Sequence, residues 1–172
     1  MWIKFDLEGM KFELNIDKYY PNQNLDGKWT EVTCNFEFSN VIKYKISHDE
    51  ILLCCEVDEI RNSLERLLNN ELNEIKEFQP CEPDLTFIFN PQYDIRNDSN
   101  IIYVKPGFEI RDIKLQLRVN LWDDGLTDNY FSMTLYREDI DNLYTYLCYV
   151  TKKFDKDNPK VQELINSGII YG

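Results

Sequence analysis

The sequence is poor in histidine, glycine and long apolar runs, and each shortage excludes a class of protein. Its 172 residues include one histidine, His48, and no Cys-x-x-Cys pair, so we expect no metal site. The six glycines are too scattered to form a phosphate-binding loop. No apolar run approaches the roughly 20 residues that a membrane span needs. Residues 51–55 form one of the longest such runs.

Positive charge is also scarce, with 19 Lys and Arg against 31 Asp and Glu and a net charge of −12. This balance argues against nucleic-acid partners and against adhesion to an anionic membrane. The start of the chain lacks the basic and apolar segments of a signal peptide. The five cysteines are an odd number without framework spacing. We therefore expect a cytoplasmic protein with reduced thiols.

The chain has enough apolar residues for a core, at 43% hydrophobic and 14% aromatic, and its length predicts a single domain over residues 1–172. Several segments alternate apolar with polar residues, as half-buried strands do. In the first third they are residues 3–7, 10–16, 32–38 and 42–46. We expect turns at Glu8-Gly9 and Ser39-Asn40 to make two hairpins of them. The N-terminal hairpin and a polar loop then occupy residues 1–28.

Two later segments repeat apolar residues at helical spacing, and these predict the principal helices. The apolar stripes are Val57, Ile60, Leu64, Leu67 and Leu68, then Ile140, Leu143, Tyr144, Leu147, Thr151 and Phe154. The first helix can begin anywhere from His48 to Asp58, because residues 51–55 fit either a short strand or an early helical turn. A short helical tail over 155–172 is predicted from Asn158 as N-cap, Pro159 at the first position and Gly168 beyond the end.

Further strands are expected between and after these stripes, at residues 85–89, 101–104, 113–121 and 130–136. Loops are expected at 92–100 and at the acidic stretch 122–129. The predicted fold is therefore α+β, a mainly antiparallel sheet with two amphipathic helices packed on one face.

Enzymatic chemistry has few candidates. A nucleophilic relay would need His48 with Cys54 or Cys55, but the histidine lies in a polar corner, and most cysteines near a histidine are inert. Paired carboxylates such as Glu82 and Asp84 would need one member with a pKa raised by burial. With 31 acidic residues in the chain, such pairs also arise by chance.

Acidic residues collect in a few places, and their charge could steer a basic partner. For any one cluster, a solvated surface that serves solubility is the stronger interpretation. Trp122 stands beside two of these carboxylates, and a tryptophan among charges suits a protein-binding surface. The candidate partner-binding residues are Glu82, Asp84, Trp122, Asp123, Asp124, Asp128, Glu138 and Asp139.

Short motifs spread over most of residues 29–154 resemble the WapI family of immunity proteins. They are Leu-Glu-Arg-Leu-Leu at 64–68, Cys-Glu-Pro-Asp-Leu-Thr-Phe at 81–87, a long strand ending at 121 and a strand–helix unit over 131–147. The N-terminal hairpin and the tail lie outside this likeness. The resemblance implies a cytosolic protein without catalytic residues that covers the active site of a polymorphic toxin.

Our leading hypothesis is a non-catalytic acidic immunity protein that needs no cofactor and binds a cognate bacterial toxin domain. The negative charge suits a basic, nuclease-type toxin. The alternatives are an enzyme that uses carboxylates or Cys54 and Cys55 with His48, a generic protein-binding adaptor, and a subunit of a homo-oligomer.

Overall fold

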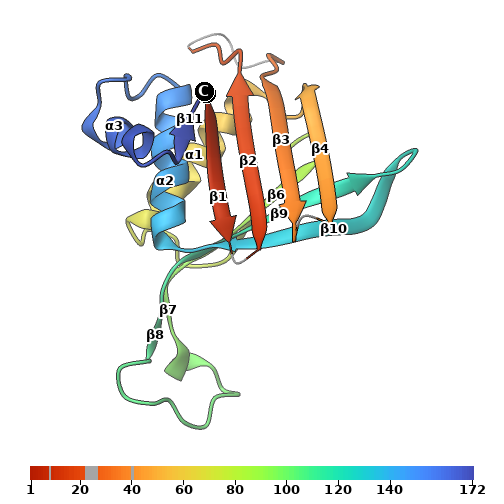
Figure 1. The fold of residues 1–172 in the computed structure, drawn as a ribbon. Coiled ribbons are helices and arrows are strands. Elements are labelled where there is room, and N and C mark those ends of the chain that lie inside the picture. Colours follow the sequence, from red (N-terminus) through yellow and green to blue (C-terminus); the bar gives the residue numbers. More distant parts are fainter. Residues whose placement is uncertain (8, 22–26, 40) are drawn as a thin grey trace.

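The computed structural model describes residues 1–7, 9–21, 27–39 and 41–172. In these ranges the chain forms three α-helices and eleven strands, most of them in two antiparallel sheets (Figure 1). The α+β class predicted from the sequence is confirmed. The expected strands divide between two sheets, because the pairing of the later strands joins segments that are far apart in the sequence.

The first sheet contains both predicted N-terminal hairpins. Its strands are β1 (Trp2–Leu7), β2 (Met10–Asp17), β3 (Glu31–Phe38), β4 (Ile42–Asp49) and the two-residue β11 (Ile170–Tyr171), in the order β11-β1-β2-β3-β4. Phe5 pairs with Phe12 across the first hairpin, and both are buried. The predicted turn residues Glu8 and Asn40 lie outside the described residues.

The second sheet is built from β5 (Lys76–Phe78), β6 (Leu85–Asn90), β9 (Lys114–Trp122) and β10 (Leu126–Leu135), in the order β10-β9-β6-β5. β6 pairs with β9 in a register that sets Phe87 opposite Leu117. The predicted loop 122–129 is shorter than expected. Asp124 and Gly125 have φ of 53° and 154°, and this tight turn lets β10 begin at Leu126.

The helices are α1 (Cys54–Leu68), α2 (Arg137–Val150) and α3 (Pro159–Asn166). α1 and α2 pack on each other; α1 also contacts β6, and α2 contacts β1, β9 and β10. α1 begins at Cys54, because Leu53 is still extended and bridges to Trp29. In the tail, the Asn158 side chain accepts the backbone N–H of Lys160 at 3.0 Å and caps α3 as predicted.

Residues 92–112 form a projecting arm (Figure 1). It contains β7 (Tyr93–Asp94), a 3₁₀ turn over Ile95–Asn97 and β8 (Ile110–Arg111). The prediction of a strand at 101–104 is wrong, and the loop expected at 92–100 contains β7 and the 3₁₀ turn. A short apolar segment forms a strand where another strand pairs with it, and residues 101–104 have no such neighbour in the described part of the chain.

Candidate functional site

Three of the predicted partner-binding residues, Glu82, Asp84 and Trp122, meet around one hollow of about 330 Å³. Asp49, the last residue of β4, and Glu50, which follows it, line the hollow as well. We call these five residues the acidic notch. Two of them, Asp49 and Glu50, were missed as site candidates, because only the fold brings the end of β4 to residues 79–84, which connect β5 to β6.

The connection between β5 and β6, residues 79–84, is held in place by β9. The Asn120 backbone N–H donates to the Asp84 carbonyl at 2.9 Å, and the Asn120 side chain donates to the Pro83 carbonyl. These two bonds fix the extended segment that two prolines, Pro80 and Pro83, keep out of regular structure. Glu82 and Asp84 are therefore held at a fixed place beside the end of β9.

Asp84 differs from the rest of the notch because its side chain is nearly covered, with 8% of the residue exposed. Burial raises the pKa of Asp84, and the negative charges of Asp49 and Glu82 raise it further. A hydrogen bond from the Trp122 side chain opposes this shift in the pKa. The tryptophan lines the same hollow as the buried carboxyl, while 42% of its own surface stays exposed.

The other notch carboxylates, Asp49, Glu50 and Glu82, are exposed. Asp49, Glu50 and Glu82 form no ion pair with any lysine or arginine that the structure describes. Lys45 is the one basic side chain among the residues that line the hollow. The notch is therefore a negatively charged surface with an aromatic ring at its edge.

The remaining predicted residues are spread along β10. Asp123 and Asp124 form the turn next to Trp122, and Asp128 is exposed on β10 itself. Glu138 and Asp139 lie past the far end of this ten-residue strand, roughly 30 Å along it. Asp139 has a structural task there, since its carboxylate accepts the Tyr136 N–H at 3.2 Å at the start of α2.

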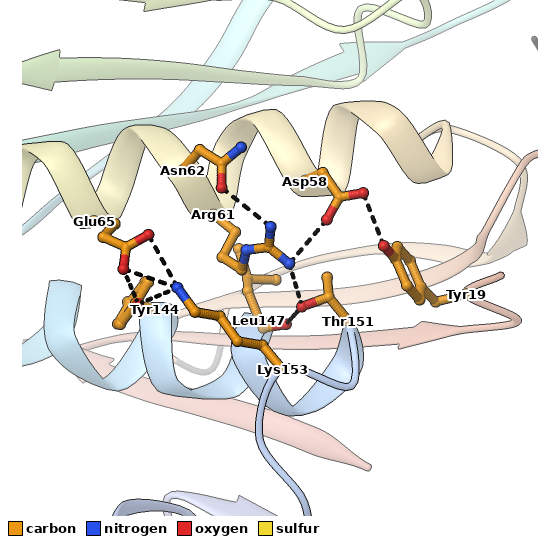
Figure 2. Close-up of polar contacts among 9 residues, drawn as sticks. All are labelled: Tyr19, Asp58, Arg61, Asn62, Glu65, Tyr144, Leu147, Thr151 and Lys153. Atoms are coloured by element: carbon orange, nitrogen blue, oxygen red, sulfur yellow. Dashed lines mark hydrogen bonds and ion pairs between the residues drawn. The ribbon is translucent and has the colours of Figure 1, made fainter. Parts of the chain in front are cut away.

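A larger hollow, of about 1070 Å³, lies beside α1 and α2 and is bordered by a polar network (Figure 2). Arg61 is at its centre: one guanidinium nitrogen donates to the Thr151 hydroxyl at 2.7 Å and lies 2.9 Å from an oxygen of Asp58. Asp58 also accepts a hydrogen bond of 2.8 Å from the Tyr19 hydroxyl. These contacts join α1 to the end of α2 and to the segment after β2.

The polar contacts between α1 and α2, which we call the seam, continue with Glu65. Its carboxylate accepts hydrogen bonds of 2.8 Å from both Lys153 and Tyr144 (Figure 2). Lys153 lowers the pKa of Glu65, and burial together with the Glu65 contact raises the pKa of Tyr144 to about 12. Both groups are moved away from neutrality, whereas a general acid or base works best with a pKa near the ambient pH. The network is suited to holding two helices together.

Burial disfavours one of the two cysteine candidates, Cys55, as a nucleophile. Cys54 and Cys55 open α1, and burial raises the pKa of the Cys55 thiol, which disfavours the reactive thiolate. The His48 side chain lies outside what the structure describes. No group of three or more histidine, cysteine or acidic side chains is arranged to hold a metal ion in the described ranges.

Together these features define an α+β protein with an open acidic face. The chain belongs to the immunity protein WapI-like family, whose sequence model matches residues 3–155. The match includes the N-terminal hairpin, which the resemblance noted from short motifs did not cover, and it stops before the α3 tail. Membership indicates an immunity function, a toxin protein as partner and a non-enzymatic role.

Comparison with curated proteins gives no significant match. None of the described helices is long and apolar enough to cross a membrane.

Proposed function

We propose that this protein binds a cognate bacterial toxin domain in the cytoplasm and neutralises it without catalysis, with the acidic notch seated on a basic surface of the toxin. Membership of an immunity family supports the kind of partner. The observation that carries the assignment of the surface is the group of unpaired carboxylates around Trp122. A single domain is expected to perform this task, because one cluster of buried side chains links both sheets and the helices.

The unpaired charges have a kinetic consequence. Exposed carboxylates without internal partners project their full field into solvent and accelerate the encounter with a basic protein. A nuclease-type toxin has such a basic surface, since it must bind phosphates. The notch would then occupy the place of the substrate's negative charges and block access to the toxin's active site.

Trp122 supplies what charge alone does not. Trp122 is 42% exposed and lines the hollow beside the buried Asp84. A tryptophan side chain has only two rotatable bonds, so it loses little conformational freedom when it becomes buried in an interface. The ring therefore serves as the apolar anchor at the edge of the charged contact.

The test uses the toxin domain encoded beside this protein and compares two double variants that change the net charge equally. Glu50→Lys with Glu82→Lys reverses the notch, whereas Glu71→Lys with Glu74→Lys reverses two exposed carboxylates in the segment between α1 and β5. We expect the notch variant to associate about tenfold or more slowly at low salt. We also expect a weaker response to salt over about 0.05 to 0.5 M. Equal association rates for the two variants would remove the notch from the interface.

A further inference from the structure

The arm, residues 92–112, exposes a group of apolar side chains that the fold does not use. Ile102 is fully exposed, and Tyr103 and Phe108 have 76% and 63% of their surface open to solvent. Tyr93 and Ile110 are also exposed large apolar residues of the arm. Single exposed apolar residues are common, but a contiguous group on one projecting segment marks an interaction site.

The arm is held in shape by its own hydrogen bonds. Ile95 N–H donates to the Glu109 carbonyl at 2.8 Å, and Gly107 N–H donates to the Glu109 carboxylate at 2.8 Å. At its base, Arg96 binds Asp94 through Nε at 2.9 Å and lowers the pKa of Asp94 to about 2. Such internal bonding presents the exposed side chains in a preformed arrangement and reduces the entropy lost on binding.

The tip of the arm, residues 99–110, carries much less charge than the rest of the molecule. Residues 99–110 contain one basic and one acidic side chain, Lys105 and Glu109, in a chain of net charge −12. The Lys105 ammonium lies 5.3 Å from the centre of the Phe108 ring. The tip is therefore nearly neutral and apolar, and the surface that accepts it is expected to be an apolar depression.

A second copy of this chain is a poor acceptor for the tip. Four of the ten residues that line the notch hollow are carboxylates, and the larger hollow beside α1 is bordered by charged groups that include Asp58, Glu59 and Arg61. Entry of the nearly neutral tip into either hollow would remove water from these charged groups without pairing them. Two chains that each carry a charge of −12 also repel one another.

We propose that the arm is a second contact element for the toxin and that Ile102, Tyr103 and Phe108 insert into an apolar depression on it. This inference rests on the proposed function. The arm leaves the second sheet just before β9 begins, and Trp122 is the last residue of β9. At about 3.3 Å per residue the strand separates the base of the arm from Trp122 by roughly 27 Å, and the arm projects from this base (Figure 1). One toxin domain can span that distance in a protein–protein interface of ordinary size.

The two elements should affect different rate constants. The notch carries unpaired charge and governs the encounter, so its loss slows association. The arm carries apolar anchors that contribute once they are buried, so its loss accelerates dissociation. In this proposal the notch, at the C-terminal end of β9, controls the association rate, and the arm, before its N-terminal end, controls the dissociation rate.

The experiment measures the binding kinetics of the adjacent toxin domain with the wild type and with Tyr103→Ser combined with Phe108→Ser. The matched control is Ile75→Ser, a substitution of an exposed apolar residue outside the arm and the notch. We expect the arm variant to bind about a hundredfold more weakly through faster dissociation, with an unchanged association rate, salt dependence and melting temperature. Ile75→Ser should bind as the wild type does.

Each other outcome has a distinct meaning. If the wild type does not bind the toxin, the proposed function itself fails. If the wild type binds and the arm variant binds equally tightly, the arm proposal alone is overturned. A wild type that sediments as a dimer and an arm variant that sediments as a monomer would assign the arm to self-association and overturn the toxin as its occupant.

Discussion

The ring of Phe36 on β3 stacks on the ring of Phe131 on β10, with centroids 4.1 Å apart and planes inclined by 14°. Tyr44 on β4 approaches the same ring at 6.3 Å. This contact joins the two sheets near the acidic notch. One side of the notch is formed by β4, and the other by the end of β9 together with the connection between β5 and β6. The site therefore depends on how the sheets pack.

Replacing Phe131 with alanine should lower the free energy of unfolding by about 2–3 kcal/mol, because the half-buried ring loses both its packing and its aromatic partner. Phe38→Ala is the control, since Phe38 is 42% exposed at the end of β3. Urea denaturation followed by circular dichroism measures both. A loss for Phe131→Ala no larger than for Phe38→Ala would contradict the packing role.

Asp84→Asn should stabilise the protein at neutral pH. Burial raises the pKa of Asp84 in the folded state above that of the unfolded chain, so folding favours the protonated form. Stability from this group is present below the unfolded pKa, near 3.9, and is lost as the pH rises through the folded value. Asparagine removes that loss and still accepts the Trp122 hydrogen bond.

The measurement is the melting temperature of both proteins from about pH 4 to pH 8, with Glu82→Gln as the exposed control for the loss of one negative charge. The advantage of Asp84→Asn should grow toward pH 8 and vanish near pH 4. An advantage that is the same at both ends of this range would mean that the carboxyl is not desolvated.

Arg61→Ala should cost about 2–3 kcal/mol, because it leaves Asp58 and the Thr151 hydroxyl without the guanidinium that joins them. Arg66→Ala, on the exposed face of the same helix, is the matched control and should change stability by less than about 0.5 kcal/mol. Chemical denaturation of the two variants compares them directly. Equal costs would show that the seam between α1 and α2 contributes little.

Tyr146→Phe tests the connection between α2 and the N-terminal hairpin. The buried hydroxyl accepts the Ile16 N–H at 2.9 Å and donates to the Met1 carbonyl at 3.0 Å. Its removal leaves both backbone groups without this partner and should cost about 1–3 kcal/mol. Tyr130→Phe, at an exposed tyrosine, should be close to neutral in the same unfolding measurement. A neutral Tyr146→Phe would indicate that other groups replace the hydroxyl.

Local patterns in the sequence predicted most elements of the fold. Alternation located the hairpin that pairs Phe5 with Phe12, and the cap at Asn158 follows from side-chain chemistry within one turn. The division into two sheets was beyond such patterns, since the pairing of Leu85 with Val119 is set by tertiary packing. The strand expected at residues 101–104 is absent for the same reason, because a short apolar segment does not show whether a neighbouring strand exists to pair with it.

The candidate site was predictable in part. Glu82 and Asp84 are close in sequence, but their meeting with Trp122 and with Asp49 depends on packing between sheets. Asp123 and Glu138, both predicted as partner-binding residues, are separated by the length of β10. The distance between these two residues could not be predicted from their spacing in the sequence, because it depends on whether the chain between them is a loop or an extended strand.

The central claim is that the protein silences a toxin by direct binding. The most direct measurement titrates the purified toxin domain, encoded beside this protein, with the wild-type chain while toxin activity and complex mass are followed together. We predict that activity falls to zero at one equivalent and that a 1:1 complex forms. Full toxin activity in the presence of excess protein, with no complex detected, would contradict the account.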